Sequence, residues 1–83
     1  MNVEEKLKEI LLEILDIKEE DITPGATLLR DLGASSIDMV EIFTAVENAL
    51  DVKLGRPDMT KIKTVQDVVD HIQTAQRQKE SVS

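Results

Sequence analysis

Apolar residues recur at helical spacing in three segments of this chain, and this periodicity limits the possible folds more than any other feature. In residues 3–14 they follow one another at steps of four, three, one and three, which gathers them on one face of a helix. Residues 37–50 and 65–75 repeat such a pattern. A chain of 83 residues has room for one domain, so the predicted fold is all-α, with a core over 3–75 and a polar tail over 76–83.

The two faces of the segment 37–50 differ in character. Winding it at the helical angle puts these residues on the inner side: Met39, Ile42, Phe43, Val46, Ala49 and Leu50. The opposite side carries Ile37, Val40, Glu41, Thr44, Glu47 and Asn48. Exposed aliphatic side chains beside acids are unusual on a purely solvated face. This face is therefore either a solvated surface or a docking surface.

Each helical segment starts with a cap pattern. Asn2 stands three residues before Glu5, and Thr64 three residues before Asp67. Ser35 and Asp38 have the S-x-x-D spacing, in which the serine side chain accepts from a backbone N–H and the acid reaches back to the cap. Ser35 is thus expected to be the helix cap. Ser36 is then left in the first turn, where unpaired N–H groups and the helix dipole favour an attached phosphodiester.

The connections carry weaker signals. Residues 16–35 have no apolar period and are predicted to form a long loop, which these side chains pin to the core: Ile17, Ile22, Leu28, Leu29 and Leu32. In 55–62, Pro57 suits either the first turn of a short helix or a tight turn, and we expect the helix. The polar tail after Gln76 is expected to fray.

The sequence argues against an enzyme and against a metal site. Its single histidine, His71, has no visible partner for nucleophilic catalysis, and "GASSI" lacks the second glycine of a G-x-S-x-G elbow. There is no cysteine to supply a thiolate or a disulfide. Four carboxylates crowd one loop but lack the alternating ligands and the central glycine of an EF-hand: Asp16, Glu19, Glu20 and Asp21.

Charge and hydropathy limit the classes of partner and the cellular location that we expect for this chain. Seventeen acids against ten bases give a net charge of −7, and the chain has no Trp or Tyr for base stacking, so a nucleic acid is a poor partner. No apolar run reaches the roughly 18 residues of a membrane span, and we expect a soluble, cytoplasmic monomer. Residues 31–52 hold five acids and no base, whereas 53–63 hold four bases and one acid. The acidic segment is the expected docking surface for a basic protein.

The stretch "DLGASSIDMVEI", residues 31–42, resembles the D-L-G-x-D-S-L-x-x-V-E signature of acyl carrier proteins. The likeness continues without a gap over residues 3–75 and includes "TLLRDLG", "VENAL" and "KIKTVQDVVDHI". It implies a bundle of three long helices and one short helix with a long first loop. It also implies that Ser36 receives a 4′-phosphopantetheine arm from a phosphopantetheinyl transferase, and that the arm carries acyl groups as thioesters in fatty-acid, polyketide or related biosynthesis.

The resemblance also implies where partners dock. Acyltransferases, ketosynthases and other acyl-processing enzymes with basic patches would contact the outer face of the second helix, at positions that here are Ile37, Asp38, Val40, Glu41 and Glu47. Three departures weaken the fit to a housekeeping fatty-acid carrier. Ser35 replaces the acid before the modified serine, Thr44 and Asn48 replace a methionine and an acid that are common on the outer face, and 53–63 is basic. The alternatives are a helical interaction module that receives no arm and a small hydrolase that uses Ser36.

Overall fold

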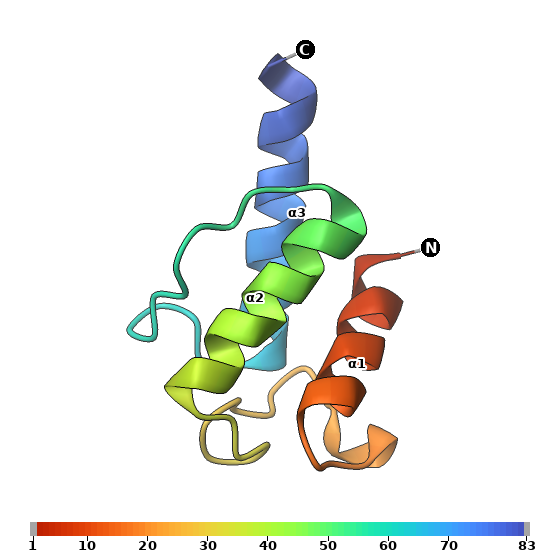
Figure 1. Ribbon diagram of the computed structural model, residues 1–83, viewed down its shortest axis with the longest axis vertical. Helices are drawn as coiled ribbons and strands as arrows, with labels where there is room; N and C mark the ends of the chain where they lie inside the picture. The colour runs from red at the N-terminus through yellow and green to blue at the C-terminus, as the bar shows by residue number, and fades with distance from the viewer. Residues whose placement is uncertain (1, 83) are drawn as a thin grey trace.

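The computed structural model describes residues 2–82, with the backbone alone for 79–82, and its regular secondary structure over this range is entirely helical. The elements are α1 (Val3–Ile14), a short 3₁₀ helix η1 (Glu19–Asp21), α2 (Ser36–Leu50) and α3 (Val65–Val82). Figure 1 shows α2 crossing in front of α3 with α1 beside them. The all-α prediction is therefore confirmed.

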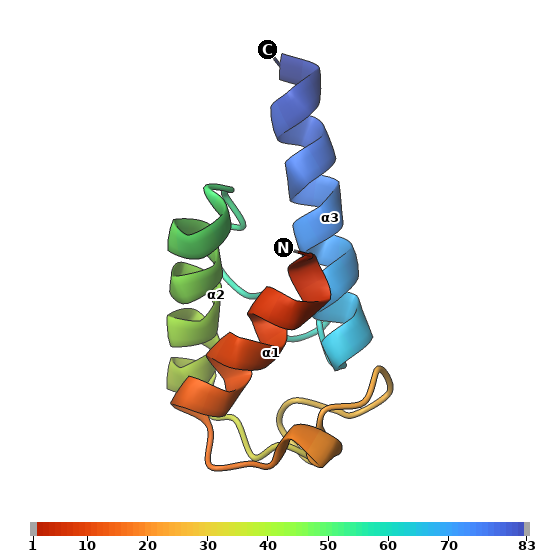
Figure 2. The same cartoon turned by 90° about the vertical axis from the view of Figure 1, so that its right-hand side faces the viewer.

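The three α-helices enclose one aliphatic core. α1 packs against both α2 and α3, and Figure 2 shows it lying between them. The predicted apolar stripes supply most of the fully buried side chains: Leu7, Leu11, Met39, Ile42, Phe43, Val46, Val68 and Ile72. On α2 the predicted inner face ends one turn early, because Ala49 is exposed and Leu50 is half-buried.

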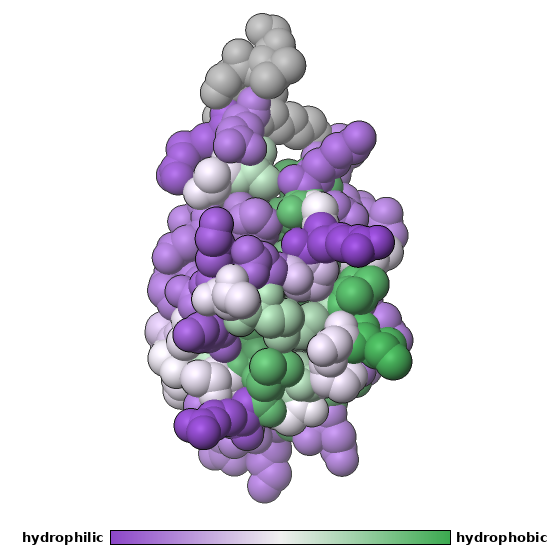
Figure 3. Space-filling model, turned by 90° about the vertical axis from the view of Figure 1, so that its left-hand side faces the viewer, coloured by the Kyte–Doolittle hydropathy of each residue, from purple (hydrophilic) through white to green (hydrophobic). Residues whose placement is uncertain are grey.

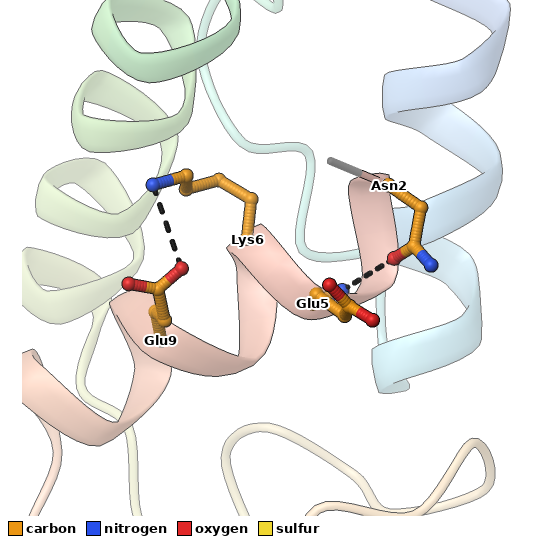
Figure 4. Close-up of polar contacts among 4 residues, drawn as sticks. All are labelled: Asn2, Glu5, Lys6 and Glu9. Atoms are coloured by element: carbon orange, nitrogen blue, oxygen red, sulfur yellow. Dashed lines mark hydrogen bonds and ion pairs between the residues drawn. The ribbon is translucent and has the colours of Figure 1, made fainter.

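Local hydrogen bonds start α1 and α3 where the cap patterns predict. Asn2 Oδ1 accepts from the Glu5 N–H at 2.8 Å, and Lys6 and Glu9 form an ion pair along α1 at 3.5 Å (Figure 4). Thr64 Oγ1 accepts from the Asp67 N–H at 3.1 Å. These bonds satisfy backbone donors that have no partner within the helix.

The first loop, residues 15–35, is attached to the start of α3. The Leu28 N–H donates to the Lys63 carbonyl at 2.9 Å and the Val65 N–H to the Ala26 carbonyl at 3.0 Å, around an isolated antiparallel bridge between Thr27 and Thr64. Leu28 and Leu32 are buried as predicted. The prediction was wrong for Leu29, which is 47% exposed, because Leu28 takes the inward position next to it.

The short helix expected in 55–62 is absent, and a single turn takes its place. The Lys61 and Ile62 N–H groups both donate to the Asp58 carbonyl, at 3.0 and 2.9 Å. Asp58 Oδ1 accepts from both the N–H and the hydroxyl of Thr60, at 3.0 and 2.6 Å. The turn does not propagate, because the next residues have other partners: the Lys63 carbonyl accepts from the Leu28 N–H and Thr64 caps α3.

α3 continues beyond the last buried residue of its apolar stripe, Ala75, and ends at Val82. Residues 76–82 contain no glycine or proline and are rich in Gln, Arg, Lys and Glu, which favour helix. Figures 1 and 2 show this end of α3 projecting past the rest of the molecule. None of the helices within residues 2–82 combines the length and the apolar character that crossing a bilayer requires.

Candidate functional site

The start of α2 is fixed by a reciprocal pair of hydrogen bonds. Ser35 is the N-cap residue: its Oγ accepts from the Asp38 N–H at 3.1 Å, while Asp38 Oδ2 accepts from the Ser35 N–H at 2.9 Å. Gly33, with φ of 70°, makes the turn that brings the chain into this cap. The cap engages the Ser35 hydroxyl and makes Ser36 the first residue of the helix.

Ser36 follows as the first residue of α2, and its surroundings differ from those of Ser35. It is exposed, and its hydroxyl forms no hydrogen bond with any described residue. The first intrahelical bond runs from the Met39 N–H to the Ser35 carbonyl, so the N–H groups of Ser36 and Ile37 come before it. These donors and the positive end of the helix dipole favour a negative group on the Ser36 oxygen.

A groove of about 510 Å³ extends from Ser36 between α2 and the connection 51–64. Val40 and Phe43 line it from α2, while Arg56, Pro57 and Met59 line it from the connection. Figure 3 views the side of the molecule where this connection lies, and apolar surface gathers in the lower middle of that side among hydrophilic side chains. Apolar side chains therefore line most of a groove that begins at Ser36.

Three of the predicted docking residues lie together beside Ser36. Ile37 is 72% exposed and Val40 is 52% exposed, which leaves two large aliphatic side chains in contact with solvent on one helix. Glu41 is exposed next to Val40. Asp38 is near them but half-buried, and its carboxylate accepts the Ser35 N–H of the cap.

Glu47 lies elsewhere and has a structural contact. Eleven residues separate it from Ser36, which is about 16 Å along the helix axis. Its Oε2 accepts from the Leu54 N–H at 2.8 Å and from the Gly55 N–H at 3.2 Å. The half-buried carboxylate thus holds the start of the connection 51–64 against the end of α2.

His71 also has a structural contact, between α3 and the rest of the fold. Its Nε2 lies 3.2 Å from the Leu54 carbonyl oxygen, and since a carbonyl only accepts, Nε2 carries the proton. The ring stacks on Phe43 with centroids 5.8 Å apart. Within residues 2–82 no hydrogen bond links Ser36 to His71 or to another side chain that could act as its base.

The acidic loop does not assemble a metal cage. Asp21 Oδ2 accepts from the Lys18 N–H at 3.0 Å, and Glu19 pairs with Lys8 at 3.5 Å. Among the residues that the structure describes, no three side chains of the His, Cys, Asp or Glu type converge to hold an ion.

Asp31 stabilises the loop that leads to the site. Its Oδ2 accepts from the Thr27 N–H at 2.8 Å, and the Asp31 N–H donates to Thr27 Oγ1 at 3.2 Å. The Thr27 backbone N–H, together with the Thr27 hydroxyl, holds the pKa of the Asp31 carboxyl below its ordinary value. The ionised carboxylate of Asp31 therefore stabilises the turn from Thr27 to Asp31, which precedes Ser36 by a few residues.

Sequence reasoning did not identify the wall of the groove that faces α2. The basic composition of 53–63 was visible, but no local pattern indicates that Arg56, Pro57 and Met59 fold back beside Ser36. That contact depends on the course of the whole connection.

A comparison with protein families agrees with this geometry. The family model described as "Phosphopantetheine attachment site" matches residues 5–72, which covers most of the chain and all of the site around Ser36. The chain therefore belongs to the phosphopantetheine attachment family, the carrier proteins whose prosthetic group is 4′-phosphopantetheine.

Proposed function

We propose that this chain is a discrete acyl carrier protein whose 4′-phosphopantetheine arm is attached to Ser36. One observation carries the proposal: within the matched family region, Ser36 is exposed at the first position of α2, while the adjacent Ser35 is engaged in the cap. The proposal extends to acyl intermediates of fatty-acid, polyketide or related biosynthesis as cargo, and to the cytoplasm as the location.

The residues around Ser36 fit such an arm. The free hydroxyl would supply the oxygen of the new phosphoester bond, which forms as the pyrophosphate bond of coenzyme A breaks and adenosine 3′,5′-bisphosphate leaves. The backbone N–H groups at the start of α2 would then stabilise the charge of the phosphodiester. The base that removes the hydroxyl proton comes from the transferase, because Ser36 has no such partner among the described residues. When bound, the group supplies a terminal thiol that holds an acyl cargo as a thioester.

The proposed docking surface consists of Ile37, Val40 and Glu41. The two aliphatic side chains offer apolar contact area, and the exposed carboxylate offers a charge to a basic patch on a phosphopantetheinyl transferase or an acyl-processing enzyme. Asp38 and Glu47 were expected to join this surface. We now propose that they contribute through the cap and the connection that they hold.

Loading with a promiscuous phosphopantetheinyl transferase, Mg²⁺ and coenzyme A tests the attachment site. Wild type and Ser35→Ala should each gain the mass of one arm, whereas Ser36→Ala should gain none. Modification of Ser36→Ala with loss in Ser35→Ala would move the site by one residue. A wild type that stays unmodified while a control carrier is loaded would favour an interaction module that needs no arm.

The docking surface is tested by charge reversal. Glu41→Lys should lower the kcat/KM of loading several-fold, because it replaces an attractive charge beside Ser36 with a repulsive one. Glu13→Lys is the matched control: it changes the net charge equally at an exposed position of α1 and should leave loading nearly unchanged. Equal loss in both variants would indicate a general charge effect and contradict a local docking surface.

A further inference from the structure

Arg56 is the charged residue among the described side chains that line the groove beside Ser36. It is exposed, and within residues 2–82 it forms no ion pair and no hydrogen bond from its side chain. Asp58 lies two residues away, but its carboxylate accepts from Thr60. A guanidinium group therefore lies at the rim of an otherwise uncharged groove without a carboxylate partner.

An arm on Ser36 would place an anion, its phosphodiester, in the groove that Arg56 lines. If Ser36 carries the arm, as proposed above, its phosphodiester is bonded to the Ser36 oxygen and lies at the Ser36 end of the same groove. A phosphodiester has one negative charge and oxygen acceptors that suit the planar guanidinium fork. The N–H groups at the start of α2 approach the same charge from the helix side.

We propose that Arg56 binds the phosphodiester of the arm and so directs the start of the arm into the groove. The contact rests on the proposed function, since it needs an arm on Ser36. It clamps the phosphodiester between the start of α2 and the connection 51–64. Beyond the phosphodiester, Val40, Phe43 and Met59 offer the apolar surface along which the arm then lies.

The test compares apo and holo protein in wild type, Arg56→Gln, Arg56→Lys and Lys53→Gln. Lys53 is the matched control, because it is an exposed cation of the same connection that lines a different hollow, with Glu47 and Asp51. The readouts are the ³¹P signal of the holo protein and the Nε–H signal of Arg56, assigned by its loss in Arg56→Gln. Intact mass first establishes that each variant carries the arm.

If Arg56 binds the phosphodiester, its Nε–H signal should shift between apo and holo wild type. Relative to holo wild type, the ³¹P signal should shift in Arg56→Gln, shift less in Arg56→Lys and stay in place in Lys53→Gln. Unchanged signals in fully loaded Arg56→Gln would overturn the contact and leave the carrier function intact. An Arg56 signal that moves only when the arm bears a malonyl group, and not with an acetyl group or the free thiol, would assign Arg56 to a cargo carboxylate and also overturn it. Absence of any arm on wild type would overturn the proposed function and this contact together.

Discussion

Ser35 and Ser36 have the same side chain but different surroundings, and substitution to alanine should separate their roles. Ser35→Ala removes the hydroxyl that accepts the Asp38 N–H, so the free energy of unfolding should fall by about 1 kcal/mol. Ser36→Ala removes no hydrogen bond seen in the structure and should change it by less than about 0.5 kcal/mol. Urea denaturation of both variants measures this. A larger loss in Ser36→Ala would contradict the assignment of the cap.

Glu41 and Glu47 make a second pair of like residues that differ in their contacts. Glu47→Ala leaves the N–H groups of Leu54 and Gly55 without their carboxylate acceptor. The free energy of unfolding should therefore fall by about 2 kcal/mol. Glu41→Ala, at an exposed position, should stay within about 0.5 kcal/mol of wild type. Chemical denaturation checks both values, and equal stability of the two variants would contradict a structural role for Glu47.

This pair also shows why sequence reasoning reached some contacts and missed others. The bonds within the Ser35–Asp38 and Thr64–Asp67 caps span three residues, so spacing alone predicts them. The Glu47 contacts reach seven and eight residues ahead and the His71 contact reaches seventeen residues back, into a connection without a periodic pattern. Spacing cannot predict contacts that depend on how a loop folds over a helix end.

The start of α3 depends on an ionised carboxylate. Asp67 Oδ2 accepts from the N–H groups of Lys63 and Thr64, at 2.9 and 3.0 Å. These bonds lower the pKa of Asp67 below its ordinary value, and the bond from Lys63 has the largest effect. A carboxyl whose pKa is lower in the folded state stabilises the fold at pH values above its unfolded pKa. That stabilisation is lost as the pH falls through the folded pKa.

Asp67→Asn should therefore flatten the acid side of the stability profile. Wild type should lose stability as the pH falls below about 4, the ordinary range of an aspartate. The variant should be less stable at neutral pH and should lose less on acidification, because it has no charge at this position to neutralise. Denaturant titrations between about pH 2 and 7 test this. Parallel profiles for the two proteins would contradict a contribution from the ionised Asp67.

The helical elements show the same division between local and distant determinants. Apolar spacing predicted the three α-helices and their buried faces, because burial of a stripe follows the helical period. The expected short helix in 55–62 is a single turn, because Lys63 pairs with the first loop and Thr64 already caps α3. α3 runs on to Val82 because residue propensity continues the helix where the apolar stripe has ended.

For the whole molecule, the net charge of −7 sets how stability responds to salt. Four acids lie close together in one loop: Asp16, Glu19, Glu20 and Asp21. Millimolar Mg²⁺ or Ca²⁺ should raise the melting temperature modestly by screening this repulsion, and NaCl should reproduce part of the effect. Thermal melts with each salt measure it. A tight stoichiometric site found by calorimetry would contradict screening as the cause.

We expect Ser36 to carry a phosphopantetheine arm in the cell. The most direct measurement is the intact mass of the protein purified from its own host, followed by fragmentation to locate the modified residue. We predict a population heavier than the unmodified chain by one arm, or by one arm with its acyl cargo, with the added mass on Ser36. Added mass on any other residue, or a chain that stays unmodified in its host and in the transferase assay, would contradict it.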